Sequence, residues 1–274
     1  MHSIMVVGLR EKDAGKTVVA QAVIEYLKEK GVNVCGYKPK AGNSFWYDYD
    51  VVYESLLQGR LYGKDAKILK NSSKTDLPEE VVNPIHRLWV ENSTYIPING
   101  LPSFLVDRVT ISEDGKFFIV VNNLELEKYP ECEKFLENLC LNAEKIFEVS
   151  DVYRLNSIIK EYYDKAVELA YKRIKQNYDI IVVESYSDIA LPWDKIENVK
   201  IILAVEPWHI YLYNPDKYLT AVKLSTQLRK EGEISTLQVK QLVKPAKEVK
   251  VAPSRSREIS RKLKEKIGEI LVES

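Results

Sequence analysis

The stretch from Ile4 to Lys28 constrains this chain more than any other. It begins with an apolar segment rich in branched side chains, Ile4 to Val7, which predicts a buried β-strand. Val18 to Lys28 places apolar residues at helical spacing and predicts an amphipathic helix. The loop between them ends in Gly15-Lys16-Thr17. A Gly-Lys-Thr at this position predicts a phosphate-binding loop, because backbone N–H groups at a helix N-terminus attract anions.

The loop is an irregular version of the P-loop motif. In that motif a first glycine lies five positions before the second, the lysine reaches the β/γ-phosphates and the threonine hydroxyl binds Mg²⁺. Arg10 occupies the position of the first glycine and the nearest upstream glycine is Gly8, so the loop is longer than usual. An ordinary strand-to-helix turn is the alternative interpretation. The residues expected to contact a nucleotide are Lys12, Asp13, Ala14, Gly15, Lys16, Thr17 and Val18.

Composition excludes several classes of function. The chain has 274 residues, enough for one large α/β domain, and its 40 basic residues balance 40 acidic ones. There is therefore no overall basic charge to suggest nucleic-acid binding. No apolar run approaches the roughly 18–20 residues of a membrane span, and we expect no signal peptide, because the N-terminus leads straight into a predicted strand. Three cysteines without metal-ligand spacing predict reduced thiols. We expect a cytoplasmic protein that binds neither nucleic acid nor membrane.

Two further predicted strands end in charged residues. Val32 to Tyr37 leads into Lys38, and Tyr178 to Val183 ends at Glu184. Ligands collect at the carboxyl ends of strands in open α/β sheets, so both residues are candidates for the same site. An acid at the end of such a strand holds Mg²⁺ directly or through water. The alternative for Glu184 is that it caps the following turn.

The rest of the chain predicts an α/β fold. Phe104 to Asn122 reads as two strands joined by a glycine turn, which predicts a β-hairpin inserted at the rim of the sheet. Val199 to Val205 predicts another buried parallel strand, and Val239 to Leu242 and Val249 to Pro253 are candidates for the last strands. We expect a single domain over residues 1–274, with a mostly parallel sheet, helices on both faces and the hairpin at about 104–122.

Four segments, in chain order, resemble the dethiobiotin synthetase family and its wider P-loop relatives, the cobyrinic acid amidases and the MinD-like ATPases. They are Gly15-Lys16-Thr17, Gly36-Tyr37-Lys38-Pro39, Val82-Asn83-Pro84 and Asp179 to Glu184. Abundant Lys, Glu, Ile and Tyr, with only 2 methionines and 3 cysteines, is a compositional hint of a thermophile, and we expect a divergent archaeal or thermophile member of the family that the chain resembles. The resemblance implies the P-loop NTPase fold, ATP and Mg²⁺ as ligands, and a homodimer.

The resemblance also implies one role for each matched residue. Lys16 binds the β/γ-phosphate, Thr17 and Glu184 are associated with Mg²⁺, Lys38 stabilises charge on the transferring phosphoryl group, and Asp50 is the second Mg²⁺-linked aspartate, with Asp48 as its rival. In the family, a substrate carbamate or carboxylate attacks the γ-phosphate. The mixed anhydride then closes a ring or accepts an amine.

Two segments depart from the family's pattern. Arg10 to Asp13 replaces the threonine-rich residues of the loop, with Glu11 where the MinD-like branch has its signature lysine. Ser185 to Asp188 replaces the glycine-rich run after the glutamate, adding bulk and a negative charge where an anionic substrate would dock. The nucleotide and metal positions are largely kept, whereas the positions that select the second substrate are changed.

These patterns leave three hypotheses for function. The first is an ATPase or ATP-dependent ligase acting on an unidentified small molecule. The second is a nucleotide-dependent switch or assembly ATPase or GTPase that controls a protein partner through the hairpin. The third is a degenerate P-loop domain. The chain has no Asn-Lys-x-Asp guanine signature, which favours ATP over GTP. We expect the base to be read near Val243-Lys244-Pro245 or Ala252-Pro253-Ser254.

Overall fold

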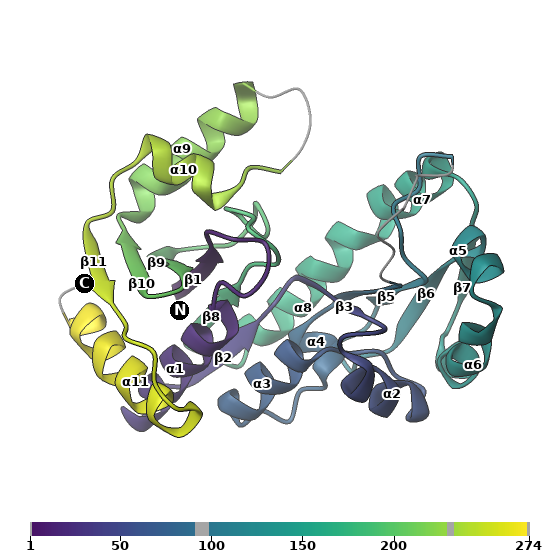
Figure 1. Cartoon of the computed structure of the whole chain (residues 1–274), viewed down its shortest axis with the longest axis horizontal. Coiled ribbons are helices and arrows are strands. Elements are labelled where there is room, and N and C mark those ends of the chain that lie inside the picture. The colour runs from purple at the N-terminus through teal and green to yellow at the C-terminus, as the bar shows by residue number, and fades with distance from the viewer. Residues whose placement is uncertain (1, 91–98, 229–232, 273–274) are drawn as a thin grey trace. The chain divides into compact units, whose positions relative to one another are not determined.

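The structure is a computed structural model that describes residues 2–90, 99–228 and 233–272. Contacts divide the chain into two compact units (Figure 1). Unit 1 comprises the residues up to Pro39, the segment Ile68–Thr75 and the residues from Ile174 onward, and unit 2 comprises Lys40–Lys67 and Asp76–Arg173. The predicted single domain stays a prediction.

Unit 1 contains a six-stranded sheet in the order β11-β10-β9-β1-β8-β2. Its strands are β1 (His2–Gly8), β2 (Val34–Tyr37), β8 (Ile180–Glu184), β9 (Val199–Glu206), β10 (His209–Tyr213) and β11 (Lys247–Lys250). The four strands β9, β1, β8 and β2 run parallel, while β10 and β11 are antiparallel additions at one edge. The parallel strands are nearly continuous apolar runs, as strands covered on both faces are.

The helices of unit 1 begin at recognisable signals. They are α1 (Lys16–Glu29), α9 (Pro215–Leu228), α10 (Thr236–Leu242) and α11 (Ser256–Val272), together with parts of α3 (Lys64–Ser73) and α8 (Asp164–Lys175). The prediction of a strand at 239–242 is wrong, because these residues belong to α10. A capping box starts this helix, with the Ser235 hydroxyl accepting from the Gln238 N–H and the Gln238 side chain accepting from the Ser235 N–H.

Unit 2 contains a five-stranded sheet in the order β3-β4-β5-β6-β7. Its strands are β3 (Lys40–Ser44), β4 (Ile85–Trp89), β5 (Val106–Thr110), β6 (Phe117–Asn122) and β7 (Ile146–Val149). Its helices are α2 (Tyr49–Leu57), α4 (Glu79–Val82), α5 (Asn123–Lys128), a 3₁₀ turn at Pro130–Cys132, α6 (Glu133–Asn142), α7 (Val152–Ile158) and a π-helical turn at Ile159–Tyr163. An apolar core joins α2 and α6 to the sheet through residues such as Leu56, Ile119 and Leu136.

The predicted hairpin is present, but it is not a rim insertion. β5 and β6 pair antiparallel, from Val106 opposite Val121 to Thr110 opposite Phe117. Both strands have a neighbour on their other side, β4 for β5 and β7 for β6. Every residue of the two strands is buried. The hairpin is therefore a central element of the second sheet.

The class of the fold is α/β, with two mixed, largely parallel sheets and interleaved helices. This arrangement is consistent with a P-loop-like α/β fold. The sequence predicts one sheet, and the second sheet is the main difference. Among the described helices, none combines the length and the apolar character that a membrane crossing requires.

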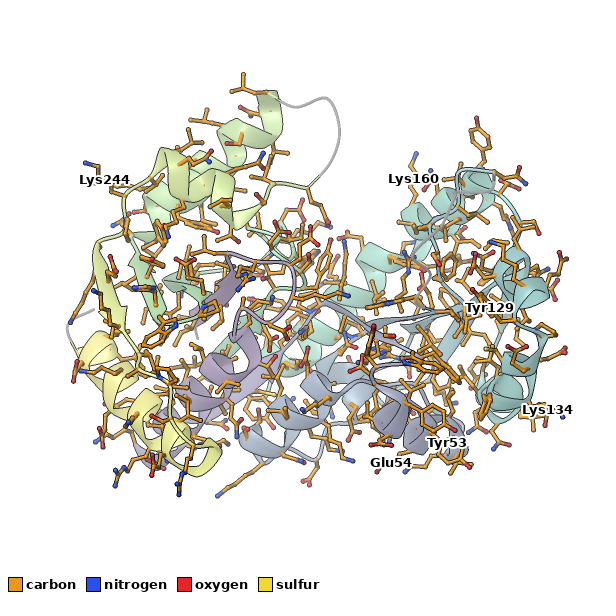
Figure 2. The ribbon with its side chains drawn as sticks, viewed as in Figure 1. Tyr53, Glu54, Tyr129, Lys134, Lys160 and Lys244 are labelled. Atoms are coloured by element: carbon orange, nitrogen blue, oxygen red, sulfur yellow. The ribbon has the colours of Figure 1, made fainter. Side chains whose placement is uncertain are left out.

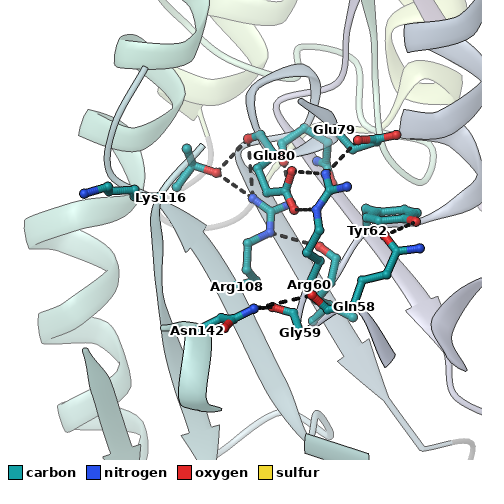
Figure 3. Close-up of polar contacts among 12 residues, drawn as sticks. Gln58, Gly59, Arg60, Tyr62, Glu79, Glu80, Arg108, Lys116 and Asn142 are labelled. Atoms are coloured by element: carbon teal, nitrogen blue, oxygen red, sulfur yellow. Dashed lines mark hydrogen bonds and ion pairs between the residues drawn. The ribbon is translucent and has the colours of Figure 1, made fainter. Parts of the chain in front are cut away.

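A buried polar cluster ties the hairpin to the segments before it (Figure 3). Arg108 is fully buried on β5 and donates to the carbonyl oxygens of Leu61 at 3.0 Å, Asn83 at 2.6 Å and Pro84 at 2.9 Å. It also donates to the Thr110 hydroxyl at 2.6 Å. Burial lowers the pKa of Arg108 to about 10, so the guanidinium stays charged at neutral pH. The cluster therefore places a permanent cation inside unit 2.

Candidate functional site

The loop between β1 and α1 presents an open helix N-terminus. Gly15 is the N-cap residue of α1 and has a φ of 90°, in the left-handed region where glycine is favoured. No side chain caps the helix, and its first turn carries no acidic residue. The first N–H groups of a helix have no partner within it, and the helix dipole makes this end positive. The end of α1 is therefore suited to an anion.

The side chain of Lys16 folds back across the end of β1. It is 8% exposed, and its Nζ donates to the carbonyl oxygen of Ser187 at 2.6 Å. A Cβ added to Gly8 would lie 2.8 Å from this Nζ and 2.9 Å from the Lys16 Cδ. Any side chain larger than hydrogen at position 8 would therefore push the lysine away. Gly8 does not occupy the usual position of the first P-loop glycine, but it makes room for Lys16.

Glu184 joins the ends of three strands. It is fully buried at the end of β8, and its Oε1 accepts from Lys38 Nζ at 2.7 Å and from the Thr17 hydroxyl at 2.8 Å. Lys38 follows β2 and is 4% exposed. β8 pairs with both β1 and β2, so the three residues meet at the carboxyl edge of the sheet. The structure thus brings Thr17, Lys38 and Glu184 together, as the strand pattern predicts.

The loop after Glu184 links Lys16 to the segment before α10. Ser187, whose carbonyl accepts from Lys16, has a φ of 46°. Beyond it, the Ala190 N–H donates to Ile234 O at 2.8 Å, and the Thr236 hydroxyl donates to Asp188 O at 2.9 Å. Sequence reasoning missed this connection. Its only sequence signal is the capping box that starts α10, which fixes Thr236 as the first residue of a helix.

The other predicted loop residues differ in exposure. Lys12, Asp13 and Val18 are exposed, with Val18 at 42%, whereas Ala14 is buried. Asp13 has a φ of 55°, so the loop contains a left-handed residue ahead of Gly15. A backbone that places left-handed and right-handed residues together can turn several N–H groups toward one anion. Contact of these loop residues with a nucleotide stays a prediction.

The predicted second metal aspartate lies in the other unit. Asp50 is exposed in the first turn of α2, which belongs to unit 2, whereas Thr17 and Glu184 belong to unit 1. Its rival Asp48 accepts from the Ser44 N–H at 3.0 Å, which gives it a structural role at the start of α2. The two aspartates therefore differ in their surroundings: Asp48 binds the backbone of Ser44, whereas Asp50 is exposed. The assignment of Asp50 as a metal ligand stays a prediction.

The donors at this edge suit Mg²⁺ that arrives with a phosphate. Thr17 and Glu184 supply a hydroxyl and a carboxylate oxygen 2.8 Å apart. No group of three or more His, Cys, Asp or Glu side chains that could hold a metal occurs within residues 2–90, 99–228 and 233–272. Mg²⁺ is usually held by one or two carboxylates together with substrate phosphates rather than by an all-protein cage. The residues present therefore fit this ion.

Comparison with known proteins gives a distant and partial similarity. No family model matches the chain. The ATP-dependent dethiobiotin synthetase BioD 2 of Salmonella typhimurium is 33% identical over 124 residues, which cover 42% of this chain and 49% of that protein. The protein of the same name from Escherichia coli K12 is 34% identical over the same shares. The chain spans about half the length of the curated relatives it matches. The resemblance to dethiobiotin synthetase, a P-loop NTPase family, is thus confirmed as partial similarity.

Proposed function

We propose that this chain is a Mg²⁺-dependent nucleotide-binding protein with the P-loop NTPase fold, and that it uses ATP as an ATPase or a ligase acting on a small molecule. The convergence of Thr17, Lys38 and Glu184 beside the open end of α1 carries this proposal. The partial similarity to an ATP-dependent synthetase supports ATP as the nucleotide. The P-loop NTPase fold that we propose for unit 1 has helices on both faces of its sheet.

Each residue of the site has a task in this proposal. The N–H groups at the start of α1 bind the phosphates, and Lys16 moves from Ser187 O to the β/γ-phosphates. Lys38 neutralises charge on the transferring phosphoryl group. Glu184 orients both Lys38 and the Thr17 hydroxyl through one carboxylate oxygen. Mg²⁺, when bound, offsets phosphate charge beside Thr17 and Glu184.

A switch ATPase or GTPase is the second candidate, and one observation favours it. The loop from Ser185 to Ala190 holds Lys16 at one point and the segment from Ile234 to Thr236 at another. Movement of Lys16 onto a phosphate would therefore release the carbonyl of Ser187, and the loop could pass this change on to the segment from Ile234 to Thr236. Since the hairpin lies inside the sheet of unit 2, this loop is the better candidate for controlling a protein partner. A degenerate P-loop domain is the third candidate function. The homodimer and the cytoplasmic location stay predictions.

Calorimetric titration of ATP and GTP, each with Mg²⁺ and again with excess EDTA, tests the proposal. We expect micromolar binding that weakens in EDTA, because chelation removes the Mg²⁺ that offsets phosphate charge. Absence of binding to either nucleotide would contradict the proposal and favour the degenerate domain. Hydrolysis assays then separate the first two candidates. A ligase is accelerated by a small carboxylate or amine substrate, and a switch by a protein partner or by dimerisation.

Replacement of Lys38 should slow turnover more than it weakens binding. We expect Lys38→Ala to lower the rate of nucleotide hydrolysis about 10²-fold, as removal of a fixed electrostatic stabiliser does. The variant also removes the buried ion pair between Lys38 and Glu184, so its melting temperature must be compared with wild type. Lys40→Ala removes the neighbouring lysine and is the matched control. A folded Lys38→Ala variant with the wild-type rate would show that Lys38 is structural only.

A further inference from the structure

The turn that joins β9 to β10 holds a tryptophan in an unfavourable backbone conformation. Glu206 pairs with His209 across it, so Pro207 and Trp208 are the two turn residues. Trp208 has a φ of 75°. A proline followed by a residue of positive φ is typical of a type II turn, whose third position favours glycine. Trp208 therefore occupies a position where a bulky side chain strains the backbone.

Burial of the indole does not account for this strain. Trp208 is 57% exposed. A hydrogen bond fixes the backbone of Trp208, because its carbonyl oxygen accepts from the Val251 N–H at 2.8 Å. The neighbouring strand ends are also fixed, since Glu206 Oε1 accepts from Tyr211 at 2.7 Å and from Lys240 at 2.9 Å. The fold thus holds a large aromatic face in solvent on a rigid turn. Strained residues that packing does not explain are concentrated at functional sites.

The turn lies at the same edge of the sheet as the P-loop. β9 is the direct neighbour of β1 (Figure 1), and the Leu9 N–H donates to Val205 O at 2.9 Å. The Val205 Cγ1 also lies 3.7 Å from the position of a Cβ on Gly15, so Val205 touches both ends of the loop. Trp208 follows Val205 by three residues, which span at most about 10 Å. The backbone of Trp208 therefore lies within about 10 Å of Val205, the residue that contacts both ends of the loop.

The strand order separates the two sides of the phosphate site. In the order β9-β1-β8-β2, Glu184 and Lys38 follow β8 and β2, on one side of β1. Trp208 follows β9, on the other side. A nucleotide whose terminal phosphate faces Lys38 and whose phosphates rest on α1 extends its nucleoside in the opposite direction. That direction leads toward the end of β9.

We propose that Trp208 is the platform on which the base of the bound nucleotide stacks. This inference rests on the proposed function, because it needs phosphates at the end of α1. Stacking on an aromatic ring tolerates any base and is strongest for the larger purines, so the site is suited to both ATP and GTP and less to pyrimidine nucleotides. Val251, which holds the turn, leads directly into Ala252-Pro253-Ser254, one of the two segments predicted to read the base. Lys244, in the other segment, is exposed and extends outward from the ribbon (Figure 2).

The test compares a nucleotide with the same phosphates without a base. Mg²⁺-ATP, Mg²⁺-GTP and Mg²⁺-tripolyphosphate are titrated calorimetrically into wild type and Trp208→Gly. Glycine accepts the φ of 75°, so the variant should fold and should melt no lower than wild type. We expect ATP and GTP to bind about tenfold more weakly to Trp208→Gly, and tripolyphosphate to bind equally well to both proteins. Trp208→Tyr keeps a stacking ring and should restore most of the affinity.

Tyr153→Ala is the matched control, since it removes an aromatic side chain that is 84% exposed on α7 of unit 2, and it should leave all three affinities unchanged. Unchanged ATP affinity in Trp208→Gly would overturn the stacking proposal, and so would an equal loss for tripolyphosphate. In either case the proposed function stands if Lys16→Ala still abolishes binding. Failure of wild type to bind any of the three ligands overturns both proposals together.

Discussion

Lys16→Ala should weaken the binding of Mg²⁺-ATP at least about 30-fold. Truncating one partner of a buried, hydrogen-bonded charge pair costs about 2–5 kcal/mol, and each 1.4 kcal/mol is a factor of ten in affinity. Lys16 is the cation nearest the open end of α1 by sequence, and its side chain is almost fully buried across Gly8. The triphosphate of the nucleotide would lose this partner. Calorimetric titration of both proteins measures the change directly.

Folding of the Lys16→Ala variant should be nearly unaffected. Lys16 donates to the neutral carbonyl of Ser187, a backbone group that lies in a surface loop and whose loss of one donor costs about 1 kcal/mol. Lys30→Ala, at the opposite end of the same helix and exposed, is the matched control and should bind ATP like wild type. Wild-type affinity in Lys16→Ala would contradict the assignment of residues 12–18 as a P-loop. Equal losses in both variants would point to a general effect of charge.

The meeting of Thr17, Lys38 and Glu184 in unit 1 could be predicted because its signals are local. A buried strand, a Gly-Lys-Thr and an amphipathic helix follow one another in the sequence, and Glu184 and Lys38 each end an apolar run. Parallel strands of one sheet bring such ends together whatever their separation along the chain. The contact between Lys16 and Ser187 could not be predicted, because it depends on the path of a loop with a positive φ at a serine.

The sheet of unit 2 was harder to predict because charged residues lie inside it. Asp107 and Arg108 are neighbours on β5 and both are fully buried, so the strand lacks the alternation that marks an exposed hairpin. Asp107 is paired with Arg87 at 2.6 Å and accepts from the Tyr163 hydroxyl at 2.6 Å. Arg108 finds its partners in carbonyl oxygens and in the Thr110 hydroxyl. Partners this distant in sequence leave no local pattern, and the hairpin was therefore expected at the rim.

Arg108→Met should destabilise unit 2 by about 3–5 kcal/mol. Methionine keeps much of the buried volume but removes every donor, so the carbonyl oxygens of Leu61, Asn83 and Pro84 lose a partner. Each buried polar group left unsatisfied costs about 1–3 kcal/mol. Arg108→Lys should recover little, because an ammonium on a flexible stem cannot reproduce the planar fork of the guanidinium. Urea unfolding, followed by amide exchange in β4, β5 and β6, measures the loss and localises it.

Arg154→Met, an exposed arginine on α7 of the same unit, is the control and should change stability by less than about 0.5 kcal/mol. A wild-type unfolding midpoint for Arg108→Met would show that water replaces the guanidinium at no cost. The expected loss has a consequence for the fold, since Asn83-Pro84 is one of the four segments that resemble dethiobiotin synthetase. Arg108 donates to both carbonyls of this segment, and the Thr110 N–H donates to that of Pro84 at 2.9 Å, so β5 of the hairpin helps to hold the segment in place.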